Sequence, residues 1–261
     1  MRSSPFAALD GRWTPAPDGA RVSFLTTRDV AHRGFWGPGI PENSLAAASA
    51  AIAEGFAIEC DVRLSRDGTV FIFHDDETMR LTGQPGRISH STAAEIAVLR
   101  LAGGDDQPVP SLTQLLALIA GRVPLLIEIK TDTPAEAAPL CLAVRRVLEG
   151  YRGPVAVMGF NPDVSRWFGI HAPRIVHGLV MTEHRETRLR AIRDAIVRRL
   201  AVRRARPDFL AYDVRFLPSA LPSALRSAGL PVLSWTVRSP ADSATVASHA
   251  DRPIFERALP A

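Results

Sequence analysis

Short apolar runs rich in β-branched residues recur along the whole chain, and most are separated by a helical pattern of apolar residues. Such alternation predicts a parallel sheet covered by helices. The predicted strands are 29–32, 57–62, 125–129, 155–160, 175–181, 209–214, 232–237 and 253–256. A further run, 69–74, follows the hairpin turn signal Asp67-Gly68, so we expect it to pair antiparallel with the second strand.

Helix start and stop signals stand between these strands. Ser or Asn is favoured just before a helix, Pro at its first position, and Gly just after its end. The sequence predicts helix starts at Asn43-Ser44, Ser111-Leu112, Pro134, Asn161-Pro162 and Ser239-Pro240, with ends of the first three near Gly55, Gly121 and Gly150.

Eight strand–helix units favour a closed barrel over an open doubly wound sheet. The chain has 261 residues, and about 250 residues is usual for one (β/α)8 barrel. No Gly-x-Gly-x-x-Gly sequence follows the first strand, which disfavours a dinucleotide-binding fold. We therefore predict the α/β class, with residues 1–261 as a single TIM (β/α)8 barrel domain.

Residues 75–110 interrupt the repeat, because they carry only a short helical pattern near 91–100. We expect a small insertion after the second strand that lies over the barrel mouth. Its apolar residues are predicted to form the buried stripe of one helix, and they are Ile88, Ile96, Val98, Leu99 and Leu101.

The composition is that of a globular protein, with 46% hydrophobic and 22% charged residues. No run reaches the roughly 18 apolar residues of a membrane helix, and residues 1–29 lack the apolar region of a signal peptide. We expect no transmembrane segment and a cytoplasmic location. Cys60 and Cys141 fit no metal motif and are expected to be buried free thiols.

Arginine supplies the formal net charge of +4, since Lys130 is the only lysine, and nine arginines lie in residues 185–206. One interpretation of this stretch is a surface for an anionic partner, either nucleic acid or a membrane. We favour a solvated helix whose core-facing stripe is Ile192, Ile196 and Leu200, spaced at i, i+4 and i+8. We therefore expect no nucleic-acid partner, while the oligomeric state stays open.

Three carboxylates occupy runs that otherwise look buried. Glu59 and Asp61 are two residues apart and share one face of a strand, and Glu128 lies within the apolar run 125–129. Buried like charges repel one another unless a cation lies between them. Carboxylates without cysteine suit a hard cation, so we predict Mg²⁺ or Ca²⁺ bound by Glu59, Asp61 and Glu128.

Two histidines stand at predicted strand ends that flank these acids. They are His32 and His74. Histidine is the side chain type that suits proton transfer near neutral pH, and displacement at phosphorus requires one proton to be removed and one delivered. Arg33 can hold a phosphate diester with two parallel hydrogen bonds, and Lys130 shares a face with Glu128. Strand C-termini gather at one end of a barrel, so these groups predict a metal-assisted phosphoryl-transfer site.

The chain resembles the glycerophosphodiester phosphodiesterase family. The matching segments run in order along most of the sequence: His32-Arg33-Gly34, Pro41-Glu42-Asn43-Ser44, Glu59-x-Asp61, Asp67-Gly68, His74-Asp75, Arg80-Leu81-Thr82, Pro110-Ser111-Leu112, Glu128-x-Lys130 and Trp235-Thr236-Val237. One departure is Arg238, which follows Trp235-Thr236-Val237 where the family often has Asn.

This resemblance implies a TIM barrel with an insertion after the second strand and a small-molecule glycerophosphodiester substrate. It implies metal ligands at Glu59, Asp61 and Glu128. It further implies acid–base histidines at His32 and His74, phosphate contacts from Arg33 and Lys130, and pocket aromatics at Phe160 and Trp235. The expected reaction is metal-dependent hydrolysis to an alcohol and glycerol 3-phosphate, and which histidine is the acid stays open.

Two alternatives are kept. A phospholipase D-like enzyme acting on lysophospholipids or sphingolipids would use a similar histidine pair and set of acids. A barrel that binds phosphate-bearing ligands without catalysis is the alternative from another class, but it predicts the loss of a histidine or an acid, and all are present.

Overall fold

A computed structural model of the chain describes residues 15–183 and 188–257. The described residues form two compact units. We call them the His32 unit, which comprises residues 30–155 and 256–257, and the Trp235 unit, which comprises residues 15–29 and 156–255.

Strand β2 (Ala57–Leu64) is the central strand of the His32 unit. It pairs in parallel with β1 (Val30–Ala31) and β4 (Leu125–Ile129), and its end pairs antiparallel with β3 (Val70–Ile72). The antiparallel pairing predicted from Asp67-Gly68 is confirmed. The helices of this unit are α3 (Leu45–Ala53), α4 (Met79–Thr82), α5 (Ala93–Ala97), α6 (Leu112–Ile119) and α7 (Ala137–Leu148), with 3-10 turns η2 (Ile88–His90) and η3 (Pro134–Glu136).

Helix starts in this unit follow the predicted caps. The Ser44 hydroxyl accepts a hydrogen bond from the Ala47 amide at the start of α3, and Ser111 forms a reciprocal capping box with Gln114 at the start of α6. The predicted start at Pro134 differs, because the chain first makes the 3-10 turn η3 and becomes α-helical at Ala137. A tightened first turn of this kind is common at helix ends.

The insertion at residues 75–110 packs around two aromatic side chains of its own unit. Ile88, Ile96 and Leu101 are buried in one cluster with Phe71 and Phe73. The prediction of one helical stripe was wrong, because the buried residues come from η2, from α5 and from the segment after α5. Val98, which follows α5, is 68% exposed rather than buried.

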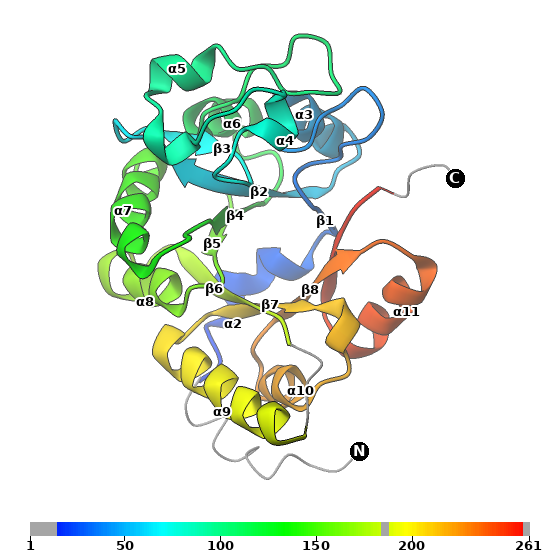
Figure 1. Cartoon of the computed structure of the whole chain (residues 1–261). Helices are drawn as coiled ribbons and strands as arrows, with labels where there is room; N and C mark the ends of the chain where they lie inside the picture. Colours follow the sequence, from blue (N-terminus) through cyan, green and yellow to red (C-terminus); the bar gives the residue numbers. More distant parts are fainter. Residues whose placement is uncertain (1–14, 184–187, 258–261) are drawn as a thin grey trace. The chain divides into compact units, whose positions relative to one another are not determined.

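The Trp235 unit contains a parallel sheet in the order β5–β6–β7–β8–β9. Its strands are β5 (Val155–Met158), which begins at the last residue of the other unit, β6 (Val176–Met181), β7 (Phe209–Asp213), β8 (Val232–Val237) and β9 (Arg252–Phe255). Its helices are α2 (Gly19–Val22), α8 (Pro162–His171), α9 (Arg188–Ala205), α10 (Ala220–Ser227) and α11 (Pro240–His249), with 3-10 turns η1 (Ser23–Thr26) and η4 (Val214–Phe216). Figure 1 labels these elements along the chain.

The sequence prediction located every strand, with bounds that agree within two residues at each end. Asn161 and Ser239 cap α8 and α11, each of which has Pro at its start as predicted. Cys60 and Cys141 are buried free thiols, also as predicted. Within the described ranges, no helix is long and apolar enough to cross a membrane.

Helix α9 contradicts the predicted core-facing stripe. Ile192, Ile196 and Leu200 are 55%, 43% and 51% exposed, whereas Val202 and Ala205 are buried in the core of the unit. The i, i+4, i+8 spacing does put the three residues on one side of the helix, but the helix packs through another side. Residues 185–187 of the arginine-rich stretch lie outside the described residues.

Candidate active site

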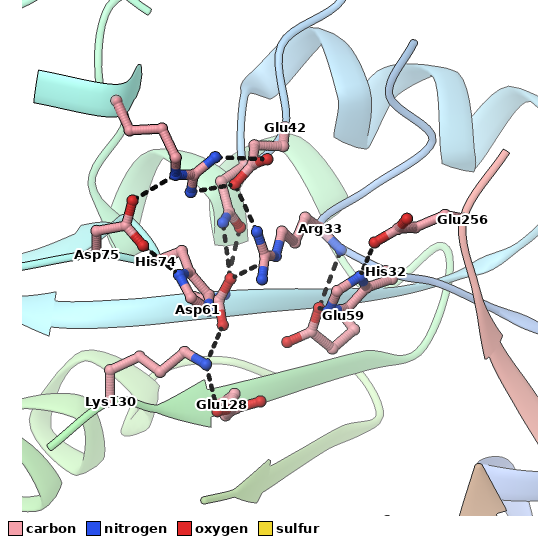
Figure 2. A network of polar contacts seen from close by, with 12 residues as sticks. His32, Arg33, Glu42, Glu59, Asp61, His74, Asp75, Glu128, Lys130 and Glu256 are labelled. Carbon is pink, nitrogen blue, oxygen red and sulfur yellow. Dashed lines mark hydrogen bonds and ion pairs between the residues drawn. The ribbon is translucent and has the colours of Figure 1, made fainter. Parts of the chain in front are cut away.

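Three buried carboxylates meet on neighbouring strands of the His32 unit, as Figure 2 shows. Asp61 on β2 is the register partner of Glu128 on β4, and Glu59 lies two residues earlier on β2. Adjacent strands are about 4.8 Å apart and side chains alternate along each strand, so all three carboxylates share one face. One oxygen of each lies within 4.8 Å of the others.

The carboxylate of Glu59 is fully buried and only partly satisfied. Its Oε2 atom accepts a hydrogen bond of 2.9 Å from the Arg33 backbone amide, whereas Oε1 has no hydrogen-bond partner. Burial, followed by the nearby charges of Asp61 and Glu128, raises the pKa of Glu59 well above its usual range. A divalent cation among the three acids would remove this repulsion and bind the unsatisfied oxygen, so the donor set fits a hard cation.

Two basic side chains hold Asp61 in its charged form. Lys130 Nζ lies 2.5 Å from Glu128 Oε1 and 3.1 Å from Asp61 Oδ1, and Arg33 Nε lies 3.2 Å from Asp61 Oδ2. Burial by itself would raise the pKa of Asp61, but the charges of Lys130 and Arg33 lower it below its usual range. Asp61 is therefore an anion in the folded protein at neutral pH.

A tight turn after β1 places Arg33 over the acids. Arg33 and Gly34 both have positive φ angles, 58° and 79°, and the Gly34 amide donates to the carbonyl of Glu59. A Cβ atom on Gly34 would lie 2.8 Å from the Cβ atom of Ala47, so only glycine fits between this turn and α3. This contact explains the glycine of the His32-Arg33-Gly34 motif.

Each predicted catalytic histidine has a carboxylate beside its Nδ1 atom (Figure 2). The distance is 2.8 Å from His32 Nδ1 to Glu256 Oε1 and 2.5 Å from His74 Nδ1 to Asp75 Oδ1. An ionised carboxylate only accepts, so Nδ1 carries a proton in both rings and Nε2 is left for chemistry. His32 Nε2 lies 3.9 Å from Glu59 Oε2, which places the ring against the acidic cluster.

The pKa of His74 is lowered from its usual value. Burial is the largest cause, and the charges of Lys130 and Arg33 add to it, while Asp61 acts in the opposite direction. The lowered pKa favours the neutral ring of His74, which is the state that can accept a proton.

Several residues of the site had been given no role from the sequence. Glu42 accepts hydrogen bonds from Arg33 at 2.7 Å and from Arg80 at 2.9 Å, and Arg80 in turn donates to Asp75 at 2.5 Å. These pairs form one continuous network from Arg33 to Asp75, the partner of His74. Glu42 and Arg80 stand in family motifs, which is the signal that could have identified them.

Asn43 and Glu256 were also missed. Asn43 is buried with a φ of 56°, and its Nδ2 atom donates to Asp61 Oδ2 at 2.9 Å. Asn43 belongs to the Pro41-Glu42-Asn43-Ser44 motif of the family, which could have identified it as a site residue. Glu256 stands outside every motif, and nothing in the sequence indicates that it lies beside His32.

Phe160 and Trp235, the two predicted aromatic site residues, lie in the Trp235 unit. Their rings meet edge to face, with centroids 5.4 Å apart and an interplanar angle of 85°. Trp235 Nε1 donates to the carbonyl of Ala211 at 3.0 Å, which anchors that ring on the neighbouring strand. Phe160 is 44% exposed, so the pair presents an aromatic surface to solvent.

Residues 32–252 match the model of the glycerophosphoryl diester phosphodiesterase family. A glycerophosphodiester phosphodiesterase from Caldanaerobacter subterraneus is 33% identical over 169 residues, which is 60% of this chain and 67% of that protein. One from Bacillus altitudinis is 32% identical over 115 residues, which is 40% of this chain and 44% of that protein. Alignments with the curated relatives commonly span about half of their length or less, for example 47% and 39%.

Solved structures establish the fold. An Oleispira antarctica phosphodiesterase in complex with the product sn-glycerol-3-phosphate has a TM-score of 0.75 at 23% identity, covering 90% of this chain and 94% of that one. A glycerophosphodiester phosphodiesterase from Agrobacterium tumefaciens has a TM-score of 0.62 at 25% identity, covering 88% and 95%. The fold is the predicted TIM (β/α)8 barrel, with β3 as an extra strand outside the ring, and the chain belongs to the glycerophosphoryl diester phosphodiesterase family.

Proposed function

We propose that the protein hydrolyses glycerophosphodiesters to an alcohol and glycerol 3-phosphate, using a divalent cation, Mg²⁺ or Ca²⁺, bound by Glu59, Asp61 and Glu128. The family and the names of the relatives support this activity. The observation that carries the proposal is a cluster of three buried acids flanked by two histidines, each with a carboxylate at Nδ1.

The histidines would move the two protons that the reaction requires. With Nδ1 hydrogen-bonded to Glu256 or Asp75, each ring presents Nε2 in a defined direction, as a general acid or base must. His74, whose pKa is lowered, suits the removal of a proton from the attacking hydroxyl. His32, carrying a second proton on Nε2, would deliver that proton to the leaving alkoxide, while the proton taken by His74 later returns to solvent. A bound cation would lower the energetic cost of negative charge on the phosphoryl oxygens.

Arg33 and Lys130 would bind the phosphate. Both already lie against the acids, and each has been placed there by ion pairs with Asp61. The planar guanidinium of Arg33 can bind two phosphate oxygens at once, whereas Lys130 offers a point charge. We also propose that Phe160 and Trp235 contact the substrate, because their rings form an edge-to-face pair in which Phe160 is exposed.

The test is the release of glycerol 3-phosphate from glycerophosphocholine and glycerophosphoglycerol, with and without a chelator. Lysophosphatidylcholine serves as the comparison substrate for a phospholipase D-like activity. We expect release from the two soluble diesters that stops with chelator and returns when Mg²⁺ or Ca²⁺ is added. Binding of glycerol 3-phosphate without any turnover would instead identify a non-catalytic barrel.

A further inference from the structure

Large apolar side chains are exposed on helix α9 and on the end of α8, both in the Trp235 unit. Ile192, Ile196 and Leu200 are joined there by Val197, which is 53% exposed, and by Ile170 of α8, which is 60% exposed. Isolated exposed apolar residues are ordinary, but a group of this size on adjacent helices indicates an interaction surface. We call these five residues the α9 apolar patch.

The α9 apolar patch lies opposite the side through which α9 packs. A helix advances about 100° per residue, so Ile192, Ile196 and Leu200 form one row along its length. Val202 and Ala205 face the core of the unit. Ile170 and Leu200 line the same hollow between α8 and α9, which connects the two parts of the patch.

Arginines are interleaved with this patch. Arg193, Arg203 and Arg204 are exposed on the same side of α9, and Asp194 is the single acid among residues 192–205. The hollow of about 740 Å³ between α8 and α9 is lined by Arg166, Arg203, Arg204 and Arg206 in addition to its apolar residues. Arg204 is paired with Asp163 of α8, at 2.6 Å and 3.0 Å, so the excess positive charge comes from the other arginines. The surface is therefore both apolar and basic.

We infer that this face of α9 docks the protein onto the surface of an anionic lipid bilayer. Helices that lie in the membrane interface combine exposed aliphatic side chains with basic residues, since the first enter the acyl boundary and the second bind lipid phosphate. The arginines match the charge of anionic head groups. The apolar row of Ile192, Ile196 and Leu200 matches the acyl boundary below them, which charge attraction by itself would not require. Nucleic acid fits less well, because the row would remain in water against a phosphate backbone and the described part of α9 has no aromatic residue for stacking on bases.

The test is co-sedimentation of the whole protein with vesicles of phosphatidylcholine alone, and with vesicles in which phosphatidylglycerol replaces half of it. We expect binding to the mixed vesicles that weakens as salt is added. Ile192→Ser/Ile196→Ser/Leu200→Ser should weaken it at least tenfold, because each side chain loses its apolar transfer energy. Arg193→Gln/Arg203→Gln should weaken it by about fivefold for each charge removed.

Met79→Ser/Val98→Ser is the control, because it removes two exposed apolar side chains, 52% and 68% exposed, from the His32 unit and should bind vesicles normally. All variants should keep activity on a soluble glycerophosphodiester, which also shows that they fold. If the serine variant does not fold, the arginine pair decides the question by itself.

Equal binding of wild type and both α9 variants to mixed vesicles would overturn the inference. Two other outcomes would also overturn it and identify another occupant. One is binding of duplex DNA, lost in the arginine pair, with no vesicle binding. The other is a concentration-dependent dimer in sedimentation velocity, lost in the serine variant, again with no vesicle binding.

Discussion

The Nδ1 atom of His32 lies 2.8 Å from Oε1 of Glu256, although the two residues are 224 positions apart in the chain. The pair joins the end of β1 to the residue that follows β9, and both side chains are mostly buried. Glu256 fixes the orientation of the imidazole and the nitrogen that carries its proton. In the proposed reaction Glu256 is therefore a positioning residue.

Glu256→Gln should lower kcat by about 10- to 100-fold, the range typical of carboxylates that orient metal-bound histidines, because Glu256 orients His32 in the same way. An amide can turn its NH₂ group toward Nδ1 and so disturb the proton arrangement. The KM should change little and the melting temperature should stay near that of wild type. Steady-state kinetics checks this, with Glu149→Gln as the control, since Glu149 is an exposed acid at the end of α7. An equal kcat in the two variants would remove Glu256 from the mechanism.

Glu59→Gln and Asp61→Asn should abolish the stabilisation of the protein by metal. A ligand at about 100 times its Kd stabilises the folded state by about 2.7 kcal/mol, so Mg²⁺ or Ca²⁺ should raise the unfolding free energy of wild type by that amount. Without metal, Glu59→Gln should be at least as stable as wild type, since it neutralises a buried carboxylate whose pKa is raised. Urea denaturation with metal or chelator measures both effects, and no metal response in wild type would argue against the site.

His32→Ala and His74→Ala should each lower kcat by about 100-fold or more, because each removes a proton-transfer group. His171→Ala, at the exposed end of α8, is the control and should keep normal turnover. Circular dichroism establishes that the variants are folded. A near-normal kcat for one of the two site variants would exclude that histidine from the reaction.

Arg33→Lys keeps the charge but should lower kcat/KM. The loss of transition-state stabilisation should be about 1.5–3 kcal/mol, the value of a hydrogen bond to a charged group. Lys130→Arg should also lower kcat/KM, but for a different reason: Lys130 Nζ lies between Asp61 and Glu128, and the bulkier guanidinium should push these acids apart. Arg33 also pairs with Glu42, so the substitution could act through the stability of the fold. The inhibition constant of glycerol 3-phosphate and the melting temperature are therefore measured together. Weaker product binding at an unchanged melting temperature identifies a phosphate contact.

Asp76 should make the stability of the insertion depend on pH. Burial by itself would raise the pKa of its carboxylate, but hydrogen bonds from the Ser89 amide, from Arg87 and from the Ser89 hydroxyl together lower it. The unfolded pKa is about 3.9, so this stabilisation is present above that pH and is lost as the pH falls through the lower folded value. Asp76→Asn should cost about 1.5–3 kcal/mol at neutral pH, and the difference from wild type should shrink in acid. Urea denaturation at several pH values measures this, with the exposed Asp105→Asn as control. A difference in unfolding free energy between wild type and Asp76→Asn that does not change with pH would contradict the prediction.

Local sequence determined the secondary structure and the choice of acids. Strands such as Leu125–Ile129 were located because β-branched apolar runs form strands wherever they are buried. Glu59 and Asp61 were placed on one face by the two-residue period of a strand, which holds in any tertiary context. The motif from His32 to Gly34 was recognised by its resemblance to the family, and only the structure shows its positive φ angles and the contact of Gly34 with Ala47.

Tertiary structure decided which surfaces meet. The period of Ile192, Ile196 and Leu200 shows that they share one side of α9, but only the packing of α9 against its neighbours shows that this side faces solvent. The pairing of His32 with Glu256 likewise depends on where distant segments end in space. A sequence period reports the direction of a side chain relative to its own helix or strand, whereas burial and partners depend on the position of that element among all the others.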